Sequence, residues 1–207
     1  MPHQHFLIHK PHGYLSQFAG EANKKKLGEF HDFPPGIMAI GRLDEDSEGL
    51  LLLTTDGRMS ELVRSNKVEK EYYAQVDGVI HDAAIESLQT GVEIGIHDVR
   101  YRTAPCAARR LDPAPAFAPR RRKIRDDRHG PTSWVSITLT EGKYRQVRKM
   151  TAAVGFPTLR LVRVRVGSLW LGNLAPGAVV EVAGFGININ RDLVAQHSGH
   201  VAGLPAD

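Results

Sequence analysis

Apolar residues along the chain form short continuous or alternating runs, which predict strands more often than helices. The run of four leucines that begins at Leu50 indicates a buried strand, and the alternation after Lys70 indicates a half-buried one. Valine alternates with arginine late in the segment 159–167, which predicts a strand with a basic outer face. The predicted strands cover residues 6–9, 36–40, 50–54, 70–78, 133–142, 159–167 and 179–182.

Fewer segments have the spacing of amphipathic helices. The predicted helices cover residues 23–31, 58–65, 81–91 and 144–156. In the third of these, Asp82 can cap the first turn, and Gly91 stands where a helix-ending glycine belongs. The proline-rich and charged segment 112–131 is predicted to be a loop. The pattern therefore predicts an α+β fold around a mixed, mostly antiparallel central sheet that is flanked by helices and loops.

Length and composition are those of an ordinary globular chain. With 207 residues, 42% of them hydrophobic and 24% charged, it forms one domain or two small ones that share a core. No apolar run is long enough to predict a membrane span, and residues 1–11 lack the pattern of a secretory signal. Cys106 is the single cysteine, so a reducing, cytoplasmic location is expected.

Basic charge is concentrated in two segments of the chain. The formal net charge is +4, but residues 109–128 carry +5 and residues 143–165 carry +7, which leaves −8 for the remainder. Such an asymmetry is typical of a surface that binds a polyanion. Two solvated charged loops are the simpler alternative, although the ordered pattern of the second segment argues against it.

Acidic residues cluster between two predicted strands, in the segment GRLDEDSEGLLLLTTDG (41–57). Asp44, Asp46 and Glu48 match the first positions of a calcium-binding EF-hand loop. The ninth position is Leu52 and the twelfth is Thr55, where that loop requires a bidentate glutamate. The flanking segments also predict strands and not helices, so the calcium interpretation fails.

A metal held by fewer ligands is a second interpretation of this loop. Asp44 and Asp46 could hold Mg²⁺ between phosphates, but no glycine-rich phosphate loop accompanies them. The N-terminal histidines lack the partners and the spacing of a transition-metal site and are interpreted as surface residues. They are His3, His5, His9 and His12. No metal site is therefore predicted.

A single working carboxylate is the third interpretation. Asp44 follows an apolar segment, and a carboxylate at the end of a buried strand requires a cation nearby. The basic helix offers Arg145, Arg148 and Lys149. An arginine against Asp44 would keep that carboxylate ionised and directed, with Glu45, Asp46 and Glu48 as solvated neighbours. An ion pair that only joins two elements fits the spacing equally well.

Four segments, which occur along the chain in the family's order, resemble the motifs of RNA pseudouridine synthases, in particular the type A ribosomal small-subunit branch. The acidic loop is similar to the catalytic segment of that family. HKPHG, KEYYAQV and EGKYRQVRKMTAAVGFPTLRLVRVRVG resemble its first motif, its Lys-x-Tyr strand and its third motif with the following strand. GYLSQF and PTSW are similar to the large-subunit rRNA pseudouridine synthase E group. The likeness extends from residue 6 to about residue 183.

The resemblance implies a fold, a domain organisation and a reaction. Residues 1–183 would form the catalytic domain, with two subdomains that share one sheet, and residues 184–207 a flexible tail. The S4 RNA-binding module of many relatives would be absent. The enzyme would be an isomerase that converts a specific uridine of ribosomal RNA, expected in the large subunit, to pseudouridine without a cofactor or metal. A cytoplasmic monomer that binds ribosomal RNA and no membrane is expected.

The resemblance also assigns roles to individual residues. Asp44 would be the nucleophilic aspartate, Tyr72 would lie against the target base, and Arg148 would pair with Asp44. The residues alone leave open whether Asp44 attacks C1′ or removes a proton from C2′. Contacts to RNA are expected from Lys10, Arg42, Lys70, Arg120, Arg121, Arg122, Arg145, Lys149 and Arg163.

Two other classes of function compete with this one. A non-catalytic RNA-binding or ribosome-assembly protein would use the same basic surface and would not need Asp44. A metal-dependent phosphoryl or glycosyl transfer enzyme would use Asp44 together with Asp46 and would lose its activity in EDTA.

Overall fold

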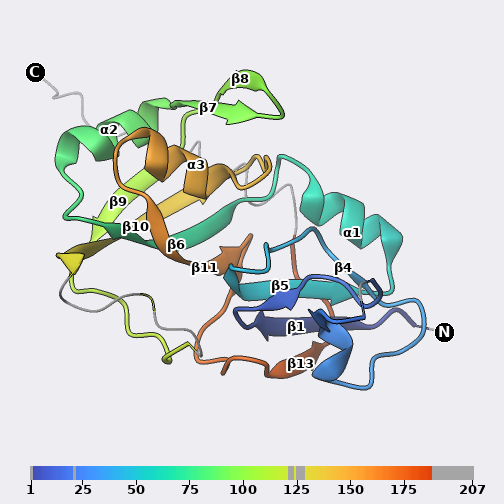
Figure 1. Ribbon diagram of the computed structural model, residues 1–207. Helices are drawn as coiled ribbons and strands as arrows, with labels where there is room; N and C mark the ends of the chain where they lie inside the picture. Colours follow the sequence, from blue (N-terminus) through green and yellow to red (C-terminus); the bar gives the residue numbers. More distant parts are fainter. Residues whose placement is uncertain (1, 21, 121–123, 125–128, 188–207) are drawn as a thin grey trace, which may run out of the picture.

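A nine-stranded sheet forms the centre of the computed structural model, which describes residues 2–20, 22–120, 124 and 129–187. The strand order is β13-β1-β5-β11-β6-β10-β9, with β4 beside β5 and β12 beside β11 (Figure 1). Among the described strands of this sheet, β5 and β11 form the one parallel pair, and the other pairs are antiparallel. The predicted α+β fold with a mixed, mostly antiparallel sheet is confirmed.

The strands and helices range in length from two to nine residues. The strands of the large sheet are β1 (His5–Lys10), β4 (Met38–Ala39), β5 (Glu48–Thr54), β6 (Lys70–Asp77), β9 (Ala107–Leu111), β10 (Thr132–Leu139), β11 (Thr158–Val166), β12 (Leu169–Trp170) and β13 (Val179–Val182). Two small sheets pair β2 (Tyr14–Leu15) with β3 (Lys25–Lys26), and β7 (Glu93–Ile96) with β8 (Val99–Arg102). The helices are the 3₁₀-helix η1 (Leu27–Glu29) and the α-helices α1 (Gly57–Arg64), α2 (Asp82–Thr90) and α3 (Gln146–Ala153).

The sheet divides into two halves, and its buried apolar residues form three clusters, the two largest of which are called the first and the second core. Figure 1 shows α2 and α3 above β6, β9 and β10, whereas α1 lies beside β5. The first core is built on Val135, Ile137 and Leu88, and the second on Leu50, Leu52 and Val162. Each of these side chains is fully removed from water, which stabilises the fold by roughly 1.5–3 kcal/mol per residue.

The two halves meet where β11 runs parallel to β5. The contact is short, because only Val162 and Arg163 of β11 stand opposite Glu48 and Gly49 of β5. Gly49 has φ 111°, and a Cβ atom at this position would lie 2.3 Å from the carbonyl oxygen of Arg163. Glycine therefore allows the two backbones to approach directly after the acidic loop.

Three predicted elements differ from the structure. The segment 23–31 forms β3 and one turn of 3₁₀-helix, since Gly28 interrupts the apolar spacing. The segment 36–40 contributes only the two residues of β4, of which Met38 is exposed. The cap of α2 is His81 and not Asp82, because the His81 ring accepts a hydrogen bond from the Ala84 amide.

The described chain remains packed beyond residue 183, where the predicted domain ends. Phe185 and Ile187 are buried in the β5–β11 core, and the Phe185 ring lies edge-on to His5 at a centroid distance of 5.0 Å. Residues 188–207 of the predicted tail lie outside the described residues. None of the helices in the described part of the chain has the length and apolar character that crossing a membrane requires.

Candidate functional site

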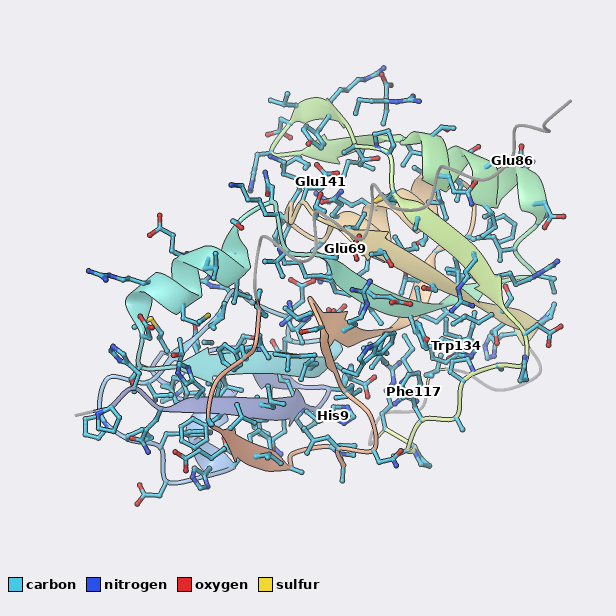
Figure 2. The ribbon with its side chains drawn as sticks, turned by 180° about the vertical axis from the view of Figure 1, so that it is seen from behind. His9, Glu69, Glu86, Phe117, Trp134 and Glu141 are labelled. Atoms are coloured by element: carbon cyan, nitrogen blue, oxygen red, sulfur yellow. The ribbon has the colours of Figure 1, made fainter. Side chains whose placement is uncertain are left out.

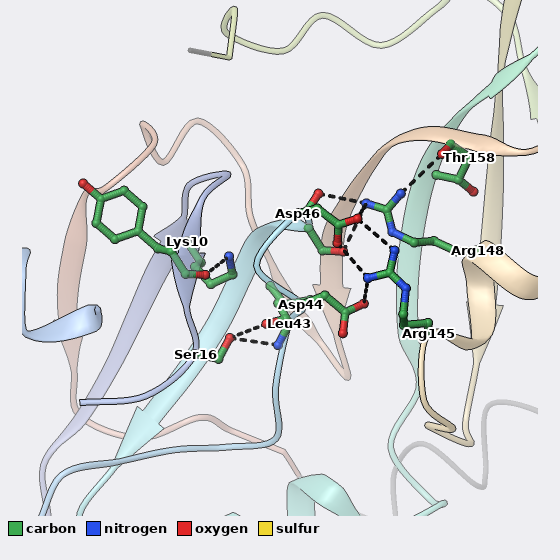
Figure 3. A network of polar contacts seen from close by, with 10 residues as sticks. Lys10, Ser16, Leu43, Asp44, Asp46, Arg145, Arg148 and Thr158 are labelled. Carbon is green, nitrogen blue, oxygen red and sulfur yellow. Dashed lines mark hydrogen bonds and ion pairs between the residues drawn. The ribbon is translucent and has the colours of Figure 1, made fainter. Parts of the chain in front are cut away.

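Asp44 lies on the loop that connects β4 to β5, and hydrogen bonds fix the residues around it. The Ser16 hydroxyl donates to the Leu43 carbonyl at 2.7 Å and accepts from the Leu43 amide at 2.9 Å (Figure 3). The Ser47 amide donates to the Asp44 carbonyl, and the Gly13 amide donates to the carbonyl of Glu45. The backbone is thus held on both sides of Asp44, while its carboxylate keeps 30% of its surface exposed.

Arg145 contacts the Asp44 carboxylate, and Arg148 does not. The Arg145 guanidinium lies 3.4 Å from Asp44 Oδ2 and donates to both carboxylate oxygens of Asp46 at 2.9 and 3.0 Å (Figure 3). Arg148 donates to the carbonyls of Asp46 and Thr158 and lies 3.4 Å from Asp46 Oδ2. The predicted pairing of Arg148 with Asp44 is therefore wrong: both guanidinium groups lie beside Asp46, but the Arg148 donors are taken up by Asp46 and the Thr158 carbonyl, and only Arg145 extends to Asp44.

The residue that reaches Asp44 is held in an uncommon backbone conformation. Arg145 precedes α3 with φ 51° and ψ 33°, the left-handed region that arginine seldom occupies. Such conformations persist only where surrounding contacts fix them, and they are frequent at functional sites. The paired hydrogen bonds from Arg145 to Asp46 are contacts of this kind.

The other acidic residues of the loop are ion-paired and not solvated neighbours as predicted. Burial alone would raise the pKa of Asp46, but the hydrogen bonds from Arg145 and the charge of Arg148 hold that pKa below its ordinary value. Glu48 is buried and accepts two hydrogen bonds of 2.9 Å from Arg160. Glu45 pairs with Lys24 at 2.9 Å, and both side chains are partly exposed. Each of these three carboxylates thus has a basic partner of its own.

Asp44 opens into a cavity of about 660 Å³. Its walls come from the acidic loop, from β6 and from the segment before α3, with Arg42, Tyr72 and Arg145 among the lining residues. The Tyr72 hydroxyl has no hydrogen-bond partner among the described residues. On the opposite face of β6, Tyr73 packs against the β5–β11 core and Phe117, as the alternation of the strand predicts.

A second cavity of about 350 Å³ adjoins the first. The two share Arg42, Tyr72, Glu141, Gly142 and Lys143, so they form one continuous cleft. The second cavity is also lined by Lys70, whose ammonium donates to the Ser65 carbonyl at 3.1 Å. Desolvation, together with the charge of Arg163, lowers the pKa of Lys70 to about 8.

Two residues expected to contact RNA are buried. Lys10 has no exposed surface, and its ammonium donates to the carbonyls of Pro11 and Tyr14 (Figure 3). Desolvation lowers its pKa to about 8, although the nearby carboxylates, Glu48 foremost, act in the opposite direction. Arg163 is 5% exposed and donates to the Leu50 carbonyl at 2.7 Å. Lys10 holds the turn beside the acidic loop and cannot contact a phosphate.

The remaining predicted RNA contacts are dispersed. Arg42 is exposed at the cleft, and Arg120 lines a separate pocket together with Pro11 and His12. Lys149 donates to the Gly95 carbonyl on the β7–β8 hairpin. Arg121 and Arg122 lie outside the described residues. The predicted basic outer face of β11 is wrong, because the arginines of this central strand are largely buried and hydrogen-bonded within the protein.

Sequence reasoning missed two residues that support the site. Ser16 holds the Leu43 backbone by two hydrogen bonds, but no periodicity or charge in the sequence distinguishes it from other serines. Glu141 lines both cavities and accepts hydrogen bonds from the Tyr101 hydroxyl, the Ala104 amide and the Gln146 side chain (Figure 2). The signal available in the sequence for Glu141 was its place between a predicted strand and a basic helix. In the described ranges, no group of three or more His, Cys, Asp or Glu residues is placed to hold a metal ion.

Comparison with known proteins places the chain among RNA-modifying enzymes. The family model described as RNA pseudouridylate synthase matches residues 4–153. A ribosomal large subunit pseudouridine synthase E from Xanthomonas axonopodis pv. citri (strain 306) is 45% identical over 174 residues, which are 82% of this chain and 89% of that protein. A protein of the same name from Vibrio parahaemolyticus serotype O3:K6 (strain RIMD 2210633) is 40% identical over 178 residues, which are 85% of this chain and 72% of that protein.

A solved structure supports the same relationship. The crystal structure of a pseudouridylate synthase superimposes with a TM-score of 0.70 at 26% sequence identity. The match covers 87% of this chain and 70% of that chain. It therefore extends over both halves of the sheet and the cleft between them.

Proposed function

Because the chain belongs to the RNA pseudouridylate synthase family, we propose that it converts a uridine of large-subunit ribosomal RNA to pseudouridine, with Asp44 acting on the ribose. The N1–C1′ bond of the uridine breaks, the uracil turns, and C5 bonds to C1′. C5 loses its proton and N1 gains one, so atoms and charge balance without a co-reactant. The large-subunit substrate follows the names of relatives that are 40–45% identical.

The position of Asp44 is the observation that carries this proposal. Its carboxylate opens into a cavity whose volume lies within the range of small-molecule sites and suits one extruded nucleoside. Extrusion of a uridine from structured RNA costs a few kcal/mol, which phosphate contacts along the cleft would offset. Arg42 and Lys143 stand at the junction of the two cavities, where they can supply such contacts.

Each neighbour of Asp44 receives a role from its contacts. Arg145 orients the carboxylate through an ion pair in which its guanidinium lies 3.4 Å from Asp44 Oδ2. Arg148 is a positioning residue that holds the Asp46 backbone. Tyr72 lines the cavity, and none of the described residues is hydrogen-bonded to its hydroxyl, so its ring can lie against uracil and its oxygen can move a proton.

Finer assignments belong to the same proposal. The motifs favour the type A ribosomal small-subunit branch of the family, and the burial of Phe185 and Ile187 extends the catalytic domain beyond residue 183. A monomer that works in the cytoplasm, where ribosomal RNA is assembled, agrees with a cleft built by one chain.

The test compares Asp44→Asn with Asp32→Asn, the same substitution at an exposed residue. Large- and small-subunit ribosomal RNA carrying tritium at uridine C5 would be supplied separately, because bond formation at C5 releases that label. We expect release from large-subunit RNA only, with a loss of about a thousandfold or more in Asp44→Asn. Equal rates for the two variants would refute the role of Asp44. Release only from the small-subunit RNA would refute the substrate assignment.

A further inference from the structure

An aromatic and cationic cluster stands on the rim of the cleft, beside Asp44, and the reaction described above does not use it. Tyr144 lines the 660 Å³ cavity and is 57% exposed. The ring of His97, at the tip of the β7–β8 hairpin, stacks with Tyr144 at a centroid distance of 5.8 Å and an interplanar angle of 24°. The Lys149 ammonium lies 5.0 Å from the centre of the Tyr144 ring. These three residues are called the rim cluster below.

The rim cluster has the composition of a platform for single-stranded RNA. Bases stack on aromatic rings whatever their sequence, and nearby cations attract the phosphates between them. Lys143, the preceding residue, is exposed at the same cleft and places its ammonium 4.9 Å from the centre of the Tyr101 ring. More than half of Tyr144 is uncovered despite its two neighbours, so a further planar group can reach it.

The position of the rim cluster indicates which nucleotide would occupy it, because Tyr144 and Asp44 line the same cavity. Tyr144 and Arg145 are consecutive, so their Cα atoms are about 3.8 Å apart. The Arg145 side chain reaches Asp44, which acts on the ribose in the cavity. A base stacked on Tyr144 therefore belongs to a nucleotide close to the extruded uridine in the chain.

We propose that Tyr144 stacks on the nucleobase adjacent to the target uridine, while Lys143 and Lys149 contact the neighbouring phosphates. The inference rests on the proposed function in assuming that the cavity receives a uridine of an RNA chain. It adds a binding subsite for the flanking nucleotide. The competing explanation is structural, namely that Tyr144 only anchors the β7–β8 hairpin to the start of α3.

The test measures binding without turnover, so its outcome is independent of the Asp44 experiment. The probe is a fluorescein-labelled RNA of ten nucleotides with one central uridine between adenosines. Two further RNAs replace the adenosine before or after the uridine by an abasic ribose. Trp170→Ala is the matched control, because Trp170 is 55% exposed, carries Arg165 at 5.5 Å from its ring centre, and lines neither cavity of the cleft.

Tyr144→Ala and Tyr144→Leu are expected to raise the Kd for the intact RNA about tenfold, and Tyr144→Phe and Trp170→Ala to change it less than about twofold. With one of the two abasic RNAs, wild type and Tyr144→Ala should bind equally well, because the base that stacks is missing. Turnover by Tyr144→Ala should show a raised KM and an unchanged kcat.

Two outcomes would contradict the proposal that Tyr144 forms a binding subsite. If Tyr144→Ala and Tyr144→Leu bind the intact RNA as wild type does, Tyr144 only anchors the hairpin or serves a protein partner. If their loss of affinity is the same on both abasic RNAs as on the intact RNA, Tyr144 does not stack on a base adjacent to the uridine.

Discussion

Strand β11 and the segment that leads into α3 both carry basic residues, but they differ in where those residues lie. On β11, Arg160 and Arg163 are buried, and their donors meet Glu48 and the Leu50 carbonyl. Before α3, the charge of Arg145 faces the cleft and reaches Asp44. A run of arginines therefore does not by itself indicate a nucleic-acid surface, because carboxylates far away in the sequence decide which charges are neutralised inside the protein.

Position in the sheet explains the difference. β11 lies between β5 and β6 in the sheet (Figure 1), and the side chains of Arg160 and Arg163 are buried there. An arginine there must find an acceptor, since an unpaired buried charge costs several kcal/mol. The segment before α3 is a loop at the cleft, where water and RNA can reach the side chains.

The largest expected effect is on stability and comes from β11. Arg160→Ala should lower the free energy of unfolding by about 3–5 kcal/mol, because Glu48 would remain buried without its partner. The control Arg100→Ala removes an arginine that is 90% exposed and lies 3.8 Å from Glu93, and should change stability by less than about 1 kcal/mol. Urea unfolding followed by circular dichroism measures both. Similar losses in the two variants would show that burial does not separate the two kinds of arginine.

The next effect is on activity and comes from the start of α3. Arg145→Ala should lower kcat/KM about 100-fold with little change in stability, because Asp44 loses its cation and its orientation. Arg148→Ala should lower kcat/KM about tenfold and also destabilise the fold by about 1–3 kcal/mol, since it leaves the carbonyls of Asp46 and Thr158 without a donor. Tritium release and urea unfolding separate the two roles. A greater loss of activity in Arg148→Ala would restore the pairing predicted from the sequence.

The sequence predicted the strands and helices well where periodicity was strong. The leucines of β5 and the alternation on β6 needed only local information, because burial on one or both faces sets those patterns. The short β4 and the 3₁₀ turn of η1 were predicted poorly, since one or two hydrogen bonds decide such pieces.

The candidate site was predicted in its members but not in its pairings. Asp44, Tyr72 and Arg145 were all identified, and the cleft brings them together. Which arginine reaches Asp44 depends on where α3 begins and on the left-handed conformation of Arg145. The burial of Lys10 depends on contacts with Pro11 and Tyr14 that no local pattern reveals.

A smaller effect concerns the pH dependence of stability, and it tests whether the Lys10 ammonium is buried as the arginines of β11 are. Its pKa is about 8 in the folded protein, against 10.5 when exposed. Between these values the unfolded chain holds a proton that the folded protein has lost, so the free energy of unfolding rises with pH. Lys10→Met abolishes this contribution. Wild type should gain on the order of 2 kcal/mol relative to Lys10→Met between about pH 7.5 and 9.5.

The control for the pH experiment is Lys67→Met, the same substitution at an exposed residue. Lys67→Met removes a lysine without removing a buried one, so any pH dependence that this variant shares with Lys10→Met is not due to burial of Lys10. Urea unfolding at several pH values provides the comparison. A constant difference between wild type and Lys10→Met would mean that Lys10 exchanges its proton as an exposed amine does.

The smallest effect concerns salt and compares the segment before α3 with β11 most directly. A cation that contacts RNA phosphate releases a counterion on binding, so Lys143→Ala should lower the slope of log Kd against log salt concentration by about 0.7. Arg163→Met should leave that slope unchanged, because the Arg163 guanidinium donates a hydrogen bond to the Leu50 carbonyl inside the sheet. Fluorescence anisotropy with the ten-nucleotide RNA over a range of salt concentrations measures both slopes. If Arg163→Met lowers the slope as much as Lys143→Ala does, β11 contributes to the RNA surface after all.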